Sequence, residues 1–529
     1  MIQDNLLLVL SLLFVITLLT MISGRLRISY PIFLVIGGLV ISLAPGIPVI
    51  SLHPDLVFLI FLPPLLFAAA RNTPWNDFWK HRRPISMLAF GLVIFTSAAV
   101  ALISHLLIPG FPLVYGFLLG GIISPPDAVA ATSVLQGLKT PKRVVTILEG
   151  ESLINDASSL IVFRFSLAAI ITGQFHLGNA ARSFFIVAGT GIAIGIAIAL
   201  VVYGIMRFFP TTPAIDAAFT LITPYVMYMT AEHFHCSGVL SVVSGGLFLG
   251  YRSQEIMGYE SRLNIAGLWD TLLFLLNGFV FILIGLELPV IVRELGNFSV
   301  AEAIFYGVAI SLVTIIVRML WVFPGAILPG LLFPRLCKKE NNPGWKEVLL
   351  IAWSGMRGVV SLASALSIPL TLGGVAFPHR NLILFITFVV ILITLVLQGL
   401  SLSPLIRWLR IEDQEENEQV QSLSLRLSLA ETVLAYLDTN YGEQIESHET
   451  YKRVRDRYER MLEVTRKKLA KEEAEEDISF LPQYRQMLIE LVQLRRKELN
   501  RFRYLGEYSE DLLREREWEL DLEEARLRN

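Results

Sequence analysis

The sequence predicts an all-α polytopic membrane protein with a charged helical tail, and three observations lead to this fold class. Of the 529 residues, 54% are hydrophobic and 17% are charged, which is far from the composition of an ordinary soluble domain. Residues 1–410 hold a series of long apolar runs, whereas residues 411–529 are dense in Glu, Arg, Lys and Asp. The chain therefore divides into a transmembrane domain, 1–410, and a tail, 411–529, that meet different solvents.

The apolar runs can be assigned to individual helices. A helix that crosses the hydrocarbon core needs about 20 apolar residues, or fewer where it is broken or buried in protein. This rule predicts thirteen transmembrane helices, at residues 5–23, 31–44, 54–70, 85–108, 112–136, 143–172, 183–208, 213–234, 237–251, 266–289, 300–329, 346–370 and 380–409. Glycine or proline interrupts several of them, so we expect broken helices.

Basic residues in the predicted loops orient these helices. Cytoplasmic loops carry an excess of Lys and Arg, and here basic and nearly neutral loops alternate. With the N-terminus outside, the cytoplasmic loops carry Arg25, Arg27, Arg71, Lys80, Arg82, Arg83, Lys139, Lys142, Arg143, Arg207, Arg252, Arg262, Arg335, Lys338, Lys339 and Lys346. The opposite loops carry only Arg182, Arg293 and Arg380. An odd number of helices then places the tail in the cytoplasm.

The tail itself is expected to form amphipathic helices. Apolar residues recur in it at spacings of three and four, as at Tyr451, Val454 and Tyr458. We favour a solvated appendage that packs on itself, with a regulatory or dimer-supporting role as the alternative.

Asp127 is the first candidate for an ion site, because an ionisable side chain at mid-membrane depth is costly and so suggests a function. It follows Ser124-Pro125-Pro126 in the fifth predicted helix. Two adjacent prolines remove two backbone donors and disfavour helix just before them, so this helix should be unwound ahead of the carboxylate. Freed carbonyls beside a carboxylate form an oxygen-rich cation site.

The next predicted helix carries two polar stripes. Ser152 and Asp156, four residues apart, share one face with Glu149, while Glu151 and Asn155 form a second pair that is turned away from it. The first stripe offers a hydroxyl and a carboxylate to a cation. The second needs a cationic partner, because an unpaired buried carboxylate destabilises a helix bundle.

Two arginines could supply that partner. Arg318 lies deep in a long apolar helix, and Arg357 lies in a glycine-interrupted one, within Trp353-Ser-Gly-Met-Arg-Gly-Val-Val360. We assign Arg318 to the Glu151 and Asn155 pair and regard Arg357 as a stabiliser of the broken-helix region. Composition alone does not decide between the two pairings.

At these residues the sequence resembles the monovalent cation:proton antiporter-1 family, which includes the sodium/proton exchangers of bacteria and animals. The resemblance covers 1–410 but not the tail. It is carried by the segments Glu149-Gly-Glu-Ser-Leu-Ile-Asn-Asp-Ala157, Ser124-Pro-Pro-Asp-Ala-Val-Ala130, Asn277-Gly-Phe-Val-Phe-Ile-Leu-Ile-Gly-Leu-Glu287 and Trp353 to Val360. One departure is Pro126, where many members carry a threonine, so Pro126 is not counted as a ligand.

The resemblance implies an inverted-repeat antiporter architecture in which a core domain moves against a dimerisation domain, usually in a homodimer. It implies that Asp156 carries the ion and the proton, with Asp127 and Ser152 as further Na+ ligands. The Asn155-Asp156 pair resembles the electroneutral branch, and the motif variants favour a bacterial plasma membrane. Membrane lipid and a second copy of the chain are the expected partners.

We therefore expect a secondary antiporter that exchanges Na+ or Li+ for H+ by alternating access, with cation and proton competing at Asp156. K+/H+ exchange is the alternative, because carboxylate and carbonyl oxygens suit all these cations and selectivity depends on cavity dimensions. An ion channel or a membrane sensor is the rival class. No pore-filter loop, row of voltage-sensing arginines or nucleotide-binding signature supports that class.

Enzymatic function is not expected. The sequence lacks a Gly-x-Ser-x-Gly elbow, a His-Glu-x-x-His motif and a phosphate loop. Its two cysteines, Cys236 and Cys337, lie far apart without partners at metal-ligand spacing. No organic cofactor, structural metal or nucleic-acid partner is predicted, and the transported ions are the substrates.

Overall fold

The computed structural model divides the chain into two compact units, Met1–Glu412 and Asp413–Asn529. The predicted end of the transmembrane domain after residue 410 lies in 410–414, outside the described residues. The structure describes residues 2–26, 29–43, 59–135, 140–173, 177–293, 295, 298–332, 344–372, 374–409, 415–470, 480–505 and 510–528.

The prediction of an all-α membrane fold is confirmed. Every range predicted to cross the membrane contains helix. The described residues also contain two short strands, β1 (Thr371–Leu372) and β2 (Val375–Ala376), which pair antiparallel. Eight described helical segments are long and apolar enough to span a membrane, at Leu6–Leu26, Arg82–Leu107, Leu113–Leu135, Lys142–Thr172, Phe185–Phe208, Tyr259–Arg293, Val300–Ala326 and Arg380–Leu409. The number of thirteen crossings stays a prediction.

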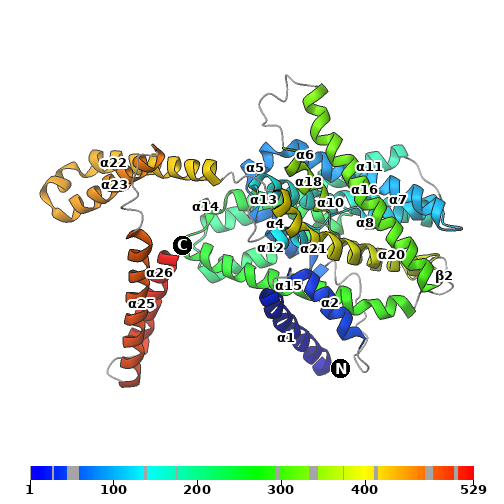
Figure 1. Ribbon diagram of the computed structural model, residues 1–529, viewed down its shortest axis with the longest axis horizontal. Helices are drawn as coiled ribbons and strands as arrows, with labels where there is room; N and C mark the ends of the chain where they lie inside the picture. The colour runs from blue at the N-terminus through cyan, green and yellow to red at the C-terminus, as the bar shows by residue number, and fades with distance from the viewer. Residues whose placement is uncertain are drawn as a thin grey trace. The chain divides into compact units, whose positions relative to one another are not determined.

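The helices of the first unit fall into two groups, each of which packs mainly on its own members. The first group consists of α1 (Ile2–Leu26), α2 (Tyr30–Ser42), α4 (Leu62–Asn72), α11 (Leu177–Phe208), α12 (Pro213–His233), α13 (Gly238–Tyr251), α14 (Ser253–Ile256) and α15 (Tyr259–Arg293). Figure 1 shows α1 and α2 beside α15. The close approach of α2 and α15 depends on Gly38 and Gly285, because a Cβ atom on either would meet the other helix's backbone.

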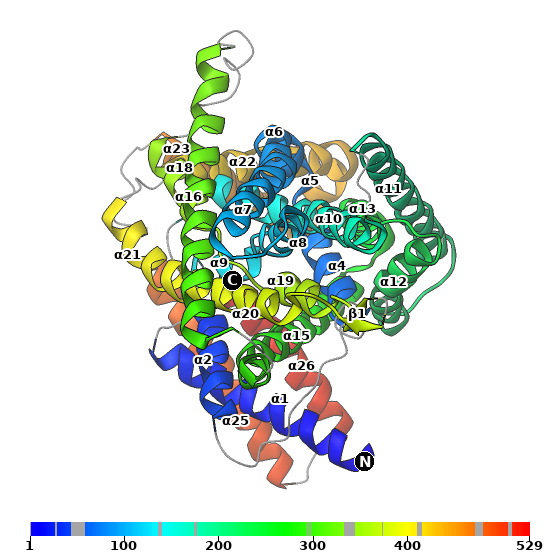
Figure 2. The ribbon, with the colours of Figure 1, turned by 90° about the vertical axis from the view of Figure 1, so that its right-hand side faces the viewer.

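The second group contains both interrupted helices. It consists of α5 (Trp75–Lys80), α6 (Arg82–Ser86), the π-helical η1 (Met87–Leu92), α7 (Val93–Leu107), α8 (Leu113–Ile123), α9 (Ala128–Leu135), α10 (Lys142–Thr172), α16 (Val300–Leu332), α18 (Trp345–Trp353), α19 (Val359–Leu366), α20 (Arg380–Ile393), the π-helical η2 (Thr394–Gln398) and α21 (Gly399–Leu409). In Figure 2, α11 and α12 of the first group lie on one flank of the unit and α16 and α21 of the second group lie on the opposite flank.

The two interrupted helices meet at their breaks. Helix α8 ends at Ile123 and α9 begins at Ala128, with the two prolines between them, as the sequence predicts. Helix α18 ends at Trp353 and α19 begins at Val359. The Asp127 backbone N–H donates to the Met356 carbonyl at 2.7 Å, so the two unwound segments hydrogen-bond to each other. The fold therefore gathers four helix ends and their free backbone groups at one place.

The described residues of the second unit form two helical hairpins. Helix α22 (Glu415–Ser447) packs along α23 (Glu449–Leu469), and α25 (Phe480–Leu505) packs along α26 (Glu510–Arg528). Exposed ion pairs such as Arg466 with Glu431 at 2.8 Å join the first hairpin. Pairs of this kind contribute little stability each, so apolar packing between the helices holds the hairpins together.

Candidate functional site

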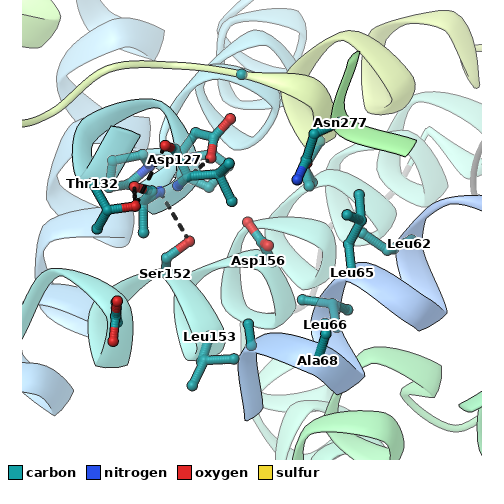
Figure 3. Close-up of a pocket in the computed structure, with 18 of the residues that line it drawn as sticks. Leu62, Leu65, Leu66, Ala68, Asp127, Thr132, Ser152, Leu153, Asp156 and Asn277 are labelled. Carbon is teal, nitrogen blue, oxygen red and sulfur yellow. Dashed lines mark hydrogen bonds between the residues drawn. The ribbon is translucent and has the colours of Figure 1, made fainter. Parts of the chain in front are cut away.

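A cavity of about 360 Å³ lies between the two helix groups of the first unit (Figure 3). The first group contributes α2, α4 and α15, and the second contributes the α8–α9 break, α9, α10 and the start of α19. The polar residues that line it are Tyr30, Asn72, Asp127, Thr132, Glu149, Ser152, Asp156, Asn277 and Ser361. All three predicted ion ligands, Asp127, Ser152 and Asp156, are among them.

Asp127 lies at the N-terminus of α9 and caps it. Its Oδ1 accepts hydrogen bonds from the backbone N–H groups of Val129 at 2.8 Å and Ala130 at 3.4 Å. A carboxylate is stabilised there, because the first N–H groups of a helix lack partners and the helix dipole is positive at that end. Gly358 lies directly against this side chain, and a Cβ atom at that position would overlap the carboxylate. Local capping and a close glycine therefore fix Asp127 at the cavity.

Ser152 connects α10 to the same break. Its Oγ accepts a hydrogen bond from the Ala128 backbone N–H at 3.3 Å, which the dashed line in Figure 3 marks. A hydroxyl oxygen has two lone pairs, so this bond leaves Ser152 able to coordinate a cation as well.

Asp156 lies one helical turn further along α10 and is only 6% exposed. Within the described part of the chain, its carboxylate makes no hydrogen bond and no ion pair, and it faces the cavity (Figure 3). An ionised carboxylate that is buried without a partner is costly, so this group is stabilised by binding either a proton or a cation. Asp156 therefore has the chemistry of an exchangeable ion site.

The Glu151 and Asn155 stripe does not share a single partner, which corrects the sequence-based assignment. Arg318 binds Glu151 through two hydrogen bonds, Nη1 to Oε1 at 2.5 Å and Nη2 to Oε2 at 2.8 Å. Asn155 instead donates from Nδ2 to the Pro126 carbonyl at 3.2 Å. The proline break leaves that carbonyl without a helical donor, and the Asn155 amide N–H supplies one.

The Arg318–Glu151 ion pair is fully buried, with both side chains 1% exposed. Arg318 also donates from Nε at 3.2 Å and from Nη2 at 3.0 Å to the Ile351 carbonyl in α18. The pair thus joins α10, α16 and α18. Its planar two-point geometry satisfies the charges that burial would otherwise leave uncompensated.

Arg357 serves the broken helices directly. Its Nε donates to the Ile123 carbonyl at the last residue of α8 at 2.7 Å, and its Nη1 donates to the Gly355 carbonyl. A cation at a helix C-terminus complements the helix dipole. The structure therefore pairs Arg318 with Glu151, and it places Arg357 at the break, where the sequence suggested a stabiliser.

A second ion pair, unlike the first, connects one helix group to the other. Arg164 of α10 donates from Nη2 to both carboxylate oxygens of Glu232 in α12, each at 2.9 Å. Arg164 lies eight residues beyond Asp156, about 12 Å further along the helix at 1.5 Å per residue. The cavity is lined by residues of α10 up to Asp156, so this pair lies beyond the cavity along the helix.

Six polar cavity residues were not assigned to the site from the sequence, namely Tyr30, Asn72, Thr132, Glu149, Asn277 and Ser361. Tyr30, Thr132 and Asn277 lie in apolar or small-residue runs, and only the tertiary fold brings them to Asp156. Glu149 had a signal, because it shares a face with Ser152 and Asp156. In the described ranges, no group of three or more His, Cys, Asp and Glu side chains is arranged to hold a resident metal.

Comparison with known proteins places this architecture in a family. Residues 9–408 match the family model described as sodium/hydrogen exchanger, transmembrane. The chain is 35% identical over 385 residues to a Bacillus pumilus protein named sodium, potassium, lithium and rubidium/H(+) antiporter, covering 71% of this chain and 57% of the relative. It is 36% identical over 380 residues to the Bacillus subtilis protein of the same name, covering 70% and 56%. This chain therefore spans less than two thirds of the length of either relative.

A solved structure supports the fold. The chain matches the sodium proton antiporter MjNhaP1 from Methanocaldococcus jannaschii with a TM-score of 0.60 and 20% sequence identity. The match covers 78% of this chain and 100% of the archaeal one. These relatives are named as antiporters rather than enzymes. Because the family model covers most of the chain, this multi-pass membrane protein belongs to the sodium/hydrogen exchanger family.

Proposed function

We propose that the protein is a secondary active antiporter that exchanges Na+ or Li+ for H+ across a bacterial plasma membrane. The observation that carries the proposal is the Asp156 carboxylate, which is buried, lacks a partner among the described residues and faces a cavity between two helix groups. No covalent step or organic cofactor is needed, because the site only has to bind one ion or the other.

Cation and proton compete for Asp156. When it is deprotonated, it binds Na+ together with oxygen atoms of Asp127, Ser152 and the unwound backbone. A proton on Asp156 removes the negative charge and releases the cation. We assume that the protein changes between its inward-facing and outward-facing forms only when Asp156 holds either a cation or a proton. The cation gradient and the proton gradient are then coupled.

The exchange is one cation for one proton. Asp127 is engaged with two backbone N–H groups of α9, and Asn155 is uncharged, so among the three proposed ligands Asp156 is the one that changes its protonation. A cycle that returns one proton for each Na+ moves no net charge across the membrane.

The cavity represents the inward-facing form. Its lining includes Asn72 at the end of α4 and Glu149 in the first half of α10, close to the basic loops predicted to be cytoplasmic. The Arg164–Glu232 pair holds the two helix groups together on the other side. In this orientation the N-terminus is outside and the tail is cytoplasmic.

The protein works as a homodimer in lipid, as the family resemblance implies. The tail is then either a solvated appendage or a regulatory element on the cytoplasmic side.

K+/H+ exchange remains the second candidate. The two Bacillus relatives are named for potassium and rubidium as well as sodium and lithium. The oxygen ligands around Asp156 suit all four cations, so a site of this chemistry can accept the larger ones if the cavity is wide enough.

Proteoliposomes that contain the purified protein test the proposal. Na+ and Li+ should dissipate an imposed pH gradient, and Asp156→Asn, which keeps the shape but not the charge, should not respond. A dominant K+ or Rb+ response in the wild type would favour the second candidate. Full activity of Asp156→Asn would overturn the role of Asp156.

A further inference from the structure

Asn277 is a buried polar side chain of the cavity that the proposed mechanism does not use. It lies near the middle of α15, within an apolar run, and is 7% exposed. Its carboxamide makes no hydrogen bond with any residue that the structure describes. Figure 3 shows it directed into the cavity toward Asp156. An amide that is buried without a partner costs free energy, so the position calls for a ligand.

The position of Asn277 relative to the other ligands is distinctive. Asp127, Ser152 and Asp156 all belong to the second helix group, on the α8–α9 break and α10. Asn277 belongs to the first group and faces them across the cavity. A cation at Asp156 therefore has three candidate side-chain ligands on one wall and a neutral amide on the other.

We propose that Asn277 is a positioning and selectivity residue, which supplies an amide oxygen from α15 to the cation held at Asp156. This inference rests on the proposed exchange function. Rotation of the carboxamide presents either Oδ1 or Nδ2 to the cavity. With a cation bound, Oδ1 coordinates it.

The neutral amide has two consequences for exchange. It adds an oxygen ligand without adding a group that titrates, so one cation still replaces one proton. It also changes the number and strength of the oxygen dipoles around the cation, which are determinants of selectivity among alkali cations. Small cations, with their higher charge density, lose the most when such a ligand is removed.

Asn277→Leu tests the inference, because leucine has the same branched side-chain shape and no polar atom. Asn264→Leu is the matched control, since Asn264 lies on the same helix but is exposed and does not line the cavity. In proteoliposomes, Asn277→Leu should raise the apparent KM for Na+ and Li+ by about tenfold, the effect of losing one bond to a charged group. The KM for Rb+ should rise less, and the maximal rate should stay close to that of the wild type. Asn264→Leu should leave every KM unchanged.

Asn277→Asp provides the rescue variant. It retains an oxygen at the same place, so the KM for Na+ should be at or below the wild-type value. An unchanged KM in Asn277→Leu would overturn the inference. Equal losses of rate for all cations, with an unchanged ratio of KM values, would also overturn it and indicate a structural role.

A binding measurement separates this inference from the exchange function. Na+ should raise the Tm of the purified wild type, and Asn277→Leu should need about tenfold more Na+ for the same shift. If the wild type binds Na+ in this way but moves no protons, the proposed exchange fails and the role of Asn277 stands. If Asn277→Leu and the wild type have the same Na+ dependence of Tm, the role of Asn277 fails whatever the transport result.

Discussion

Arg318 and Glu151 are joined by two short hydrogen bonds in a fully buried ion pair that lies one helical turn from Asp156 on α10. Glu151 is turned away from the cavity. The Asp156 carboxylate, which faces the cavity, has no such partner among the described residues. Neighbouring turns of one helix therefore hold a carboxylate that is permanently compensated and a carboxylate that is free to exchange ions. Glu151 stabilises α10 through its ion pair, and Asp156 on the same helix is the proposed ion carrier.

Removing Arg318 should destabilise the protein. Arg318→Ala leaves the Glu151 charge buried and unpaired, and the loss of one partner of a buried ion pair costs about 3–5 kcal/mol. The double variant Arg318→Met with Glu151→Leu should recover most of that loss, because it removes both charges together. Thermal unfolding in detergent measures the effect. Wild-type stability of Arg318→Ala would show that the pair does not stabilise the bundle.

Enlarging Gly358 should disturb cation binding. A Cβ atom there would overlap the Asp127 carboxylate, so Gly358→Ala should displace Asp127 from its place at the cavity. Gly344→Ala is the control, because a Cβ atom at Gly344 has no neighbour within 4 Å. We expect a several-fold higher KM for Na+ in the first variant alone. Equal KM values in both variants would mean that the position of Asp127 does not matter.

Weakening the Arg164–Glu232 pair should favour the outward-facing form. Both side chains are partly exposed, 49% and 31%, so the pair is worth about 1 kcal/mol or less. Arg164→Gln should therefore raise the KM for Na+ at the cytoplasmic face by no more than about fivefold. Everted membrane vesicles give that measurement. The double variant Arg164→Glu with Glu232→Arg should restore the wild-type KM for Na+. An unchanged KM in Arg164→Gln would exclude a role of the pair in closure.

Exchange should not respond to membrane potential. A net movement of one charge through 100 mV changes the driving force by about 2.3 kcal/mol, which a liposome assay detects readily. The exchange of one Na+ for one H+ moves no net charge. A rate that follows an imposed potential of either sign would contradict the one-for-one stoichiometry.

The parts of the site that depend on local sequence were predictable. Pro125 and Pro126 remove backbone donors whatever surrounds them, and the α8–α9 break occurs where they lie. The spacing of Ser152 and Asp156 puts both on one face of any helix, and both line the cavity. Arg318 and Glu151 also meet, because few opposite charges are buried deeply enough to pair.

The parts that depend on tertiary contacts were not predictable. Asn155 binds a carbonyl freed by the break at Pro126, 29 residues away, rather than the arginine that pairs with its neighbour on the stripe. Asn277 is one amide in an apolar run, and nothing in its local pattern indicates that α15 presents it to Asp156. Periodicity identifies the face of a helix, but the packing of the helices decides what that face meets.

The most direct test of competition at Asp156 is the apparent KM for Na+ measured as a function of pH in proteoliposomes. If one proton and one cation compete for the same carboxylate, the KM should rise tenfold for each unit of falling pH at the acidic end, with an unchanged maximal rate at saturating Na+. A KM that is independent of pH over the range where exchange is active would show that the two ions bind at separate sites, which contradicts the mechanism.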